Sequence, residues 1–191
     1  RDPLWSRGLG DVYKRQDKID VANIPDEIKS ADLVQIAAGT DHVVAVDTDG
    51  EVYVWGNTRL QQDKFSNDMK KAMKAGGADW DVVQLEAGNQ FSAIVCSNGN
   101  LYLWGNGNMA DIKIRSKYQG KIAKVALTDN EYIALLTDGT VAYTGNKDKT
   151  PPFAKIPAGL KGKTVVDIAS TSKSVAAVTE DGEVYVWGNA V

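Results

Sequence analysis

The sequence of 191 residues predicts an all-β fold built from one repeated hairpin unit. Three observations support this prediction: a repeat that aligns without gaps, an Asp-Gly or Asn-Gly pair at the same place in every copy, and apolar runs on both sides of that pair. The four copies span residues 34–57, 83–106, 123–146 and 166–189. Internal repetition at this period is typical of propellers and solenoids.

The pair at the centre of each copy predicts a tight hairpin turn. Glycine adopts the positive φ of such a turn without a steric cost, so an Asp-Gly or Asn-Gly pair between apolar runs is the strongest short-range hairpin signal. The pairs are Asp49-Gly50, Asn98-Gly99, Asp138-Gly139 and Asp181-Gly182. We therefore expect antiparallel hairpins with turns at 47–50, 96–99, 136–139 and 179–182.

The run before each turn is continuously apolar, as at 43–46 and 133–136. A sheet with one wet face would alternate apolar and polar residues, so both faces of these strands are expected to be covered. Small sheets covered on both faces fit the blades of a β-propeller, each with about four strands around a central axis. A parallel β-helix repeats at shorter periods, and helical repeats need a 3.6-residue period.

Three of the copies end in Trp-Gly-Asn, at Trp55, Trp104 and Trp187, whereas the third has Thr144 in place of Trp. We expect these tryptophans to be buried in blade-to-blade packing, with exposed aromatic binders as the alternative. The blade with Thr144 is expected to pack less well. Residues 23–29 also align with 155–161, so the repeat is longer than its core.

The pattern Val-Gln-Ile-Ala-Ala-Gly-x-x-His at 34–42, followed by an apolar strand, Asp-Gly and Val-Tyr-x-Trp-Gly-Asn, resembles the regulator of chromosome condensation repeat. The resemblance covers roughly residues 19–191. It implies a propeller, usually of about seven blades, that acts mostly as a protein-binding platform. The eponymous protein is a guanine-nucleotide exchange factor for a small GTPase that also binds chromatin, and secreted bacterial relatives include a β-lactamase inhibitor.

The sequence departs from that family at spaced positions. The family glycine is present as Gly39 and Gly88 but is replaced by Thr128 and Thr171. The histidine is present only as His42, and the Gly-Gln-Leu-Gly element that follows Trp-Gly-Asn in the family is missing. The chain therefore resembles a divergent member from a microbial or viral source, and we do not expect GTPase exchange activity to carry over.

Four repeats fall short of the six or seven that usually close such a ring, and an open blade exposes strand edges and apolar faces. We therefore expect an incomplete ring and a fragment of a longer protein. Residues 1–16 share nothing with the repeats and resemble translated sequencing-adapter sequence, so they are expected to be a non-native or disordered leader, with a basic arm as the alternative. Residues 17–191 form the predicted partial β-propeller.

The composition of the chain limits the classes of partner that it is expected to bind. The net charge is −3, and −5 without residues 1–16, so the chain lacks the basic footprint of a nucleic-acid binder. No apolar stretch approaches the roughly 18 residues of a membrane span. The lone Cys96 lies within a strand-like run and is expected to be a buried, inert thiol. The expected partner is another protein, with no nucleic acid and no membrane span.

The sequence contains no strong catalytic, metal-binding or phosphate-binding motif. A single histidine excludes a cluster of histidine metal ligands within the chain. Residues 47–51 lack the glycine spacing of a calcium loop, and the glycines at 105–107 precede neither a Lys-Ser/Thr pair nor a clear helix. We therefore expect no catalytic residue, no metal and no cofactor.

Binding usually resides in variable insertions on a rigid scaffold. The longest segment between copies, 58–82, contains a stretch at 68–74 that predicts a short helix ended by glycines. Arg59, Phe65 and Trp80 in this segment are candidates for binding contacts. The alternative is that Phe65 and Trp80 cap a blade.

Together these features favour a non-enzymatic protein–protein interaction scaffold. Two alternatives stay open: a substrate-positioning or regulatory propeller of a larger enzyme whose catalytic domain is missing, and a secreted enzyme inhibitor. Because four blades leave the first and last sheets without neighbours, the isolated chain is expected to dimerise, aggregate or stay partly unfolded.

Overall fold

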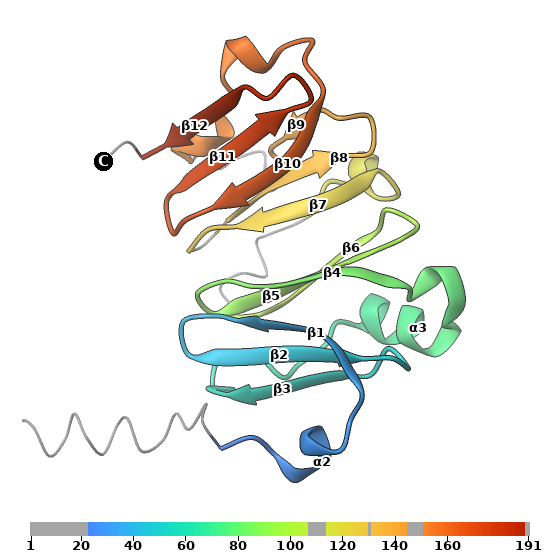
Figure 1. Cartoon of the computed structure of the whole chain (residues 1–191). Helices are drawn as coiled ribbons and strands as arrows, with labels where there is room; N and C mark the ends of the chain where they lie inside the picture. The colour runs from blue at the N-terminus through green and yellow to red at the C-terminus, as the bar shows by residue number, and fades with distance from the viewer. Residues whose placement is uncertain (1–22, 107–113, 130, 145–150, 190–191) are drawn as a thin grey trace, which may run out of the picture.

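The computed structural model describes residues 23–106, 114–129, 131–144 and 151–189. Its strands form four antiparallel sheets, each made of three consecutive strands and stacked on the next (Figure 1). The predicted all-β propeller fold is confirmed, as is the open ring. The described sheets have three strands each where about four were expected, and the described parts of the segments between sheets form turns and short helices.

The strand bounds repeat closely from sheet to sheet. They are β1 (Leu33–Ala38), β2 (His42–Asp47) and β3 (Val52–Gly56); β4 (Val82–Ala87), β5 (Phe91–Cys96) and β6 (Leu101–Gly105); β7 (Ile122–Leu127), β8 (Tyr132–Leu136) and β9 (Val141–Ala142); β10 (Val165–Ser170), β11 (Ser174–Thr179) and β12 (Val184–Gly188).

The connecting segments carry the helices. They are α2 (Asp26–Lys29), α3 (Asn67–Ala75) and the 3₁₀ turns η1 (Gly77–Asp79), η3 (Ser116–Tyr118), η4 (Pro152–Ala154) and η5 (Ala158–Leu160). Helix α3 confirms the short helix expected at 68–74. It begins where the Ser66 hydroxyl accepts a hydrogen bond from the Met69 amide at 3.2 Å, and it ends at Gly76, whose φ is 64°.

All four hairpins have the predicted turns. In each one the glycine amide donates to the carbonyl three residues earlier, at 3.1 Å for Gly50, 2.9 Å for Gly99, 3.0 Å for Gly139 and 2.9 Å for Gly182. These glycines have φ between 79° and 83°, which explains why glycine recurs there. We call the end of the stack that carries the four turns the turn rim; it is the right-hand edge in Figure 1.

The inner strands β1, β4, β7 and β10 contact one another in that order. At the second position of the repeat, the Gln35 side chain donates to the Val82 carbonyl at 3.3 Å and accepts from the Leu85 amide at 2.9 Å. Gln84 makes the matching pair with the carbonyl and amide of Val125, both at 2.8 Å. One amide side chain thus bonds each inner strand to the next in the first two interfaces.

Apolar side chains fill the space between neighbouring sheets. Val44 and Val46 of the first sheet pack with Leu85, Ile94 and Trp104 of the second, and similar clusters fill the next two interfaces. The middle strands of the inner sheets are buried along their length, which confirms that both of their faces are covered. Strand β11 of the last sheet alternates between buried and half-buried residues because no sheet in the described part of the chain packs on one of its faces.

Trp55 and Trp104 are buried, as predicted, with 7% and 5% of their surface exposed. The Trp104 indole N–H donates to the Gln62 carbonyl at 2.7 Å, and its ring meets Phe65 edge-on at a centroid distance of 5.6 Å. The half-buried Trp187 makes the matching bond to the Phe153 carbonyl at 2.7 Å. Each of these two tryptophans therefore hydrogen-bonds the outer strand of its sheet to the segment that precedes that sheet in the chain.

The third sheet replaces this tryptophan by exchanging a large and a small residue across two strands. Ser92 faces Trp104 in the second sheet, and the register of the third sheet, in which Ala134 faces Ala142, places Tyr132 opposite Thr144. Both side chains are fully buried, so the Tyr132 ring occupies the interior at this position, and the expectation that this blade packs less well stays a prediction. This exchange leaves two buried hydroxyl groups unsatisfied, because among the described residues neither has a hydrogen-bond partner, and burying such groups lowers stability.

We predict that Thr144→Trp alone destabilises the chain by about 1–3 kcal/mol, because the indole would meet the Tyr132 ring. The double variant Tyr132→Ser/Thr144→Trp recreates the pair of the second sheet and should recover most of that loss. Urea unfolding of the parent, both single variants and the double variant measures the coupling. Additive effects of the two substitutions would contradict the exchange.

We also predict that Trp55→Ala and Trp104→Ala each lower the free energy of unfolding by about 3–5 kcal/mol, the usual cost of truncating a core aromatic residue. Trp104→Phe keeps a ring but removes the bond to the Gln62 carbonyl, so its loss should be smaller. Thermal melts of either alanine variant that match the parent would contradict the packing role.

Candidate functional site

The single histidine joins the first two sheets. His42 Nε2 lies 2.8 Å from the Ser92 hydroxyl, and His42 Nδ1 lies 3.6 Å from Asp41 Oδ1. The residue types are those of a hydrolytic triad, but His42 is 0% and Ser92 1% exposed. A nucleophile must meet its substrate, so this contact is a buried hydrogen bond between blades. Sequence reasoning identified His42 as the remaining copy of the family histidine but did not find Ser92.

The family glycine and the residue three positions later depend on each other. A Cβ at Gly88 would lie 2.7 Å from Phe91 Cε1, and a Cβ at Gly39 would lie 2.3 Å from the Gly88 carbonyl oxygen and 2.6 Å from His42 Cε1. Copies that carry threonine at the glycine position have Glu131 or Ser174 in place of a ring. The ring three positions later is therefore one steric reason for the glycine, and the backbone of the next sheet is a second reason at Gly39.

Two of the three binding candidates take part in packing. The Trp80 ring is 6% exposed, and its indole N–H donates to the Gly50 carbonyl at 2.7 Å. Phe65 is half-buried against Trp104, whereas Arg59 is exposed. The packing supports the alternative in which Phe65 and Trp80 cap a blade, and a binding role for the three residues stays a prediction.

A hollow of about 640 Å³ opens on the turn rim between the first two sheets. We call it the turn-rim groove. Its lining includes Val34, Val46, Asp47, Asp49, Trp80 and Asp81. The tight turn at 47–50 and the 3₁₀ turn η1 form its walls, and both are fixed by the Trp80 bond to the Gly50 carbonyl.

The groove is negatively charged. Asp47 is held in place by hydrogen bonds from the backbone amides of Asp49 and Glu51, at 3.0 and 2.8 Å, while Asp49 and Asp81 are exposed to solvent.

Burial, aided by the nearby Asp81 and Asp79, raises the pKa of the Cys96 thiol to about 12. The thiol is buried, as the sequence predicted, and the raised pKa disfavours the reactive thiolate form.

Further acidic side chains lie along the rest of the turn rim. Asp138 is exposed in the third turn, and Asp181 and Glu183 belong to the fourth hairpin. Lys163 pairs with both Asp181 and Glu183, at 3.3 and 2.5 Å, which reduces the charge at that corner. The turn-rim groove therefore combines an apolar floor with the carboxylates of Asp47, Asp49 and Asp81, which form no ion pair with a lysine or arginine of the described ranges.

Three valines at the first position of the repeat are exposed. Val34, Val83 and Val166 expose 57%, 49% and 55% of their surface, in β1, β4 and β10. The pairing of each inner strand is irregular at this position, which turns the side chain away from the core. Sequence reasoning missed this valine row, because an exposed valine within an apolar run resembles a core valine.

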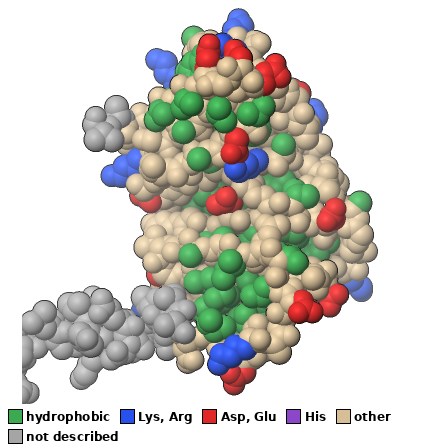
Figure 2. Space-filling model, in the orientation of Figure 1, with side chains coloured by type: hydrophobic (Ala, Val, Ile, Leu, Met, Phe, Trp, Pro, Cys, Tyr) green, Lys and Arg blue, Asp and Glu red, His purple; other side chains and the backbone are tan. Residues whose placement is uncertain are grey.

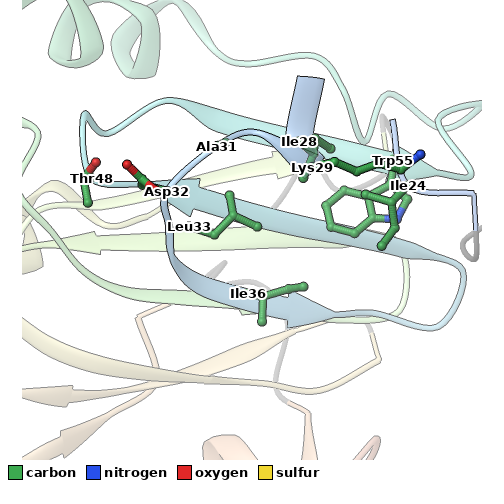
Figure 3. Close-up of a pocket in the computed structure, with 9 residues that line it drawn as sticks. All are labelled: Ile24, Ile28, Lys29, Ala31, Asp32, Leu33, Ile36, Thr48 and Trp55. Carbon is green, nitrogen blue, oxygen red and sulfur yellow. The ribbon is translucent and has the colours of Figure 1, made fainter. Parts of the chain in front are cut away.

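A second hollow, of about 540 Å³, lies on the outer face of the first sheet (Figure 3). Figure 3 shows Ile24, Ile28 and Trp55 on one side of it, and Leu33 and Ile36 along β1 on the other. Within the described ranges, no sheet packs on this face. Its side chains are those that meet a preceding sheet elsewhere in the stack.

Neither a cluster of metal ligands nor a membrane-spanning helix is present in the described ranges. Within the described ranges, no group of three or more His, Cys, Asp or Glu side chains is placed to hold a metal ion. No helix in the same part of the chain is long and apolar enough to cross a membrane.

Comparison with known proteins identifies the repeat. The model of the Regulator of chromosome condensation (RCC1) repeat matches residues 33–62 and 82–109. The chain is 26% identical to the human E3 ubiquitin-protein ligase HERC2 over 196 aligned residues, covering 89% of this chain and 4% of that protein. It is also 46% identical to protein pim1 of Schizosaccharomyces pombe over 33 residues, covering 17% of this chain and 6% of pim1.

Solved structures share the fold. Human WBSCR16 superposes with a TM-score of 0.61 at 16% identity, over 84% of this chain and 49% of that one. Yeast RCC1 (Prp20), solved bound to Kap60, gives 0.61 at 20% identity, over 84% of this chain and 44% of that one. The chain thus spans less than half of these structures and a small part of the curated relatives.

We predict that the His42 contact makes stability sensitive to acid. Burial lowers the pKa of His42 below its ordinary value of 6.5, and the Asp41 carboxylate opposes part of that shift. Below about pH 6.5 the unfolded chain therefore binds more protons than the folded chain, so stability is retained above this pH and lost as the pH falls.

The test compares urea midpoints of the parent and of His42→Gln at neutral and mildly acidic pH. Glutamine keeps a hydrogen-bonding group beside Ser92 but does not titrate, so the variant should lose less stability between the two pH values. Because the chain has one histidine, no second imidazole confuses the comparison. An equal acid loss in both proteins would contradict the prediction.

Proposed function

We propose that this chain, which belongs to the regulator of chromosome condensation repeat family, is a non-enzymatic scaffold that binds another protein. Propellers of this family commonly serve protein interaction, but a fold alone does not assign a function. The observation that carries the proposal is the turn-rim groove, where an exposed valine and exposed carboxylates lie together on a rigid rim.

The rigidity of the groove favours binding. Its walls are a tight turn and a 3₁₀ turn bonded through the Trp80 indole, so little conformational freedom is lost when a partner binds. Val34 offers apolar contact beside the groove floor of Val46 and Trp80. The carboxylates of Asp49 and Asp81 add a charge that a partner must complement.

These features define the chemistry of the partner segment. An aliphatic side chain fits against Val34 and the groove floor, and flanking lysine or arginine residues complement Asp49 and Asp81. The valine row extends apolar contact along the inner strands, toward Val83 and Val166. A single extended segment or loop of another protein is therefore the proposed occupant.

The test begins with a displayed library of random peptides selected against the chain. The expected consensus is an aliphatic residue flanked by lysine or arginine. For one selected peptide, fluorescence anisotropy should show binding that weakens with salt and that falls by about 10-fold or more, roughly 1.4 kcal/mol, in Asp49→Lys/Asp81→Lys.

Asp138→Lys is the matched control, because it reverses an exposed turn carboxylate on the third sheet, away from the groove. This variant should bind the peptide within about two-fold of the parent. Selection of no basic consensus, or equal losses in the control and groove variants, would contradict the proposed site.

The match to HERC2 favours a second candidate function. Because 89% of this chain aligns with a segment of an E3 ubiquitin-protein ligase, the repeats fit a substrate-positioning or regulatory part of a larger enzyme. The complete gene sequence separates the two candidates. An adjoining catalytic domain would support the second, and repeats without one would support the scaffold.

A further inference from the structure

The first two sheets meet at the turn rim in a different way from the sheets that follow. We propose that the Trp80 indole acts as a spacer there, and that it leaves the Val82 N–H in the turn-rim groove to donate a hydrogen bond to a main-chain carbonyl of the partner segment. This role for Val82 rests on the proposed function, because it concerns how the same groove holds its occupant.

At the other two interfaces, the first residue of the next sheet is hydrogen-bonded to the preceding turn. The Ile122 amide of β7 donates to the Gly99 carbonyl at 3.0 Å, and the Val165 amide of β10 donates to the Gly139 carbonyl at 2.9 Å. The Gly120 amide adds a second bond to the Gly99 carbonyl, also at 3.0 Å. Main-chain hydrogen bonds therefore close the turn rim at the second and third interfaces.

The first interface lacks the equivalent bond. Val82 begins β4 at the equivalent position of the repeat, but no hydrogen bond joins its amide to the Gly50 carbonyl, although both residues are described. The Trp80 indole N–H donates to that carbonyl instead, at 2.7 Å. Trp80 occupies the repeat position of Gly120, so a large ring stands where the second interface has no side chain.

The surroundings of the turn glycines show the effect of this ring on spacing. A Cβ at Gly99 would lie 2.5 Å from the carbonyl carbon of Gly120, so the second turn packs directly on main chain. A Cβ at Gly50 would instead lie 2.9 Å from Cδ1 of the Trp80 ring and 3.8 Å from the Trp80 carbonyl oxygen. The Tyr102 ring supports the indole at a centroid distance of 5.5 Å. The indole therefore separates the first turn from the main chain before β4.

The pairing of β4 with β5 sets the direction of the Val82 N–H. The Ser97 amide donates to the Asp81 carbonyl at 2.8 Å, so the adjacent residues Val82 and Cys96 form a non-hydrogen-bonded pair. The N–H and C=O of a residue in such a pair point to the same side, away from the paired strand. The Val82 carbonyl accepts from the Gln35 side chain of the first sheet, so the Val82 N–H also points toward that sheet, at the groove that Val82 lines.

An extended partner segment can use this donor. A carbonyl of the segment that accepts the Val82 N–H takes the role that the turn carbonyl has at the other two interfaces. Figure 2 shows hydrophobic and acidic side chains together along the right-hand edge of the molecule, where the turn rim lies. The main-chain bond supplies affinity for any extended segment, whereas Val34, Asp49 and Asp81 select its aliphatic and basic side chains.

Amide hydrogen exchange followed by NMR tests the spacer without a partner. In the parent, the Val82 amide should be at least about 10-fold less protected than the amides of Ile122 and Val165, which are bonded to turn carbonyls. Trp80→Gly recreates the residue of the second interface, so the first turn should close onto β4 and protect the Val82 amide. Equal protection of the three amides in the parent would overturn the spacer. So would unchanged Val82 exchange in a folded Trp80→Gly, and the parent alone decides if that variant does not fold.

A variant without the donor tests the bond to the partner. Val82→Pro removes the N–H but no hydrogen bond between β4 and β5, and proline is tolerated at the first residue of a strand. Val82→Ala is the matched control, because it shortens the side chain and keeps the N–H. For a peptide selected against the parent, Val82→Pro should bind about 5-fold or more weakly than Val82→Ala. Equal affinities of two folded variants, verified by far-ultraviolet circular dichroism, would overturn the donor role.

The two measurements have different consequences for the groove. The exchange rates decide the spacer whether or not any peptide binds. If the selection returns no basic peptide, the proposed function fails and the donor role of Val82 fails with it. If a selected peptide depends on Asp49 and Asp81 but binds Val82→Pro and Val82→Ala alike, the groove keeps its proposed function and only the donor role is overturned.

Discussion

The packing of each sheet on the next is the contact on which the rest of the structure depends. A sheet of three short strands is marginal by itself, because it buries too little apolar surface to offset the entropy lost on ordering. The middle strands are apolar on both faces, and stacking the sheets buries this apolar surface, so that Val44 and Ile94 are fully buried. The same arrangement requires a neighbour on each face of every sheet, and within the described ranges the first and fourth sheets each have one neighbouring sheet.

Polar side chains fix the register of this packing and also protect the inner strands. An inner strand has free amide and carbonyl groups along its edge, which would otherwise invite pairing with another chain. Gln35 and Gln84 satisfy some of these groups with one side chain each. At the third interface the ion pair of Lys124 and Asp167 replaces the amide, and it lowers the pKa of Asp167. Lysine suits a carboxylate partner but cannot accept an amide N–H, so this exchange also favours one order of the sheets.

The sequence predicted the elements that depend on local chemistry and missed those that depend on contacts across strands. The turns followed from glycine at Gly50 and its equivalents, and the burial of Trp55 and Trp104 followed from their place in the repeat. Tyr132 was not predicted as the replacement for the missing tryptophan, because an alignment of copies does not show which residues face each other. The exposure of Val34 was missed for a related reason: an irregular pairing beside Leu33 turns the side chain, and nothing in the apolar run marks that irregularity.

These contacts explain why some copies depart from the repeat pattern. Thr128 and Thr171 replace glycine only where no ring follows three positions later, and Thr144 replaces tryptophan where a tyrosine stands opposite. Such paired changes preserve packing, so they carry little information about function. Function is better sought in features that packing does not require. The carboxylates of the turn-rim groove and the valine row are of this kind, because the sheets would stack equally well with other polar residues at Asp49 and Asp81 or with shorter side chains in place of the exposed valines.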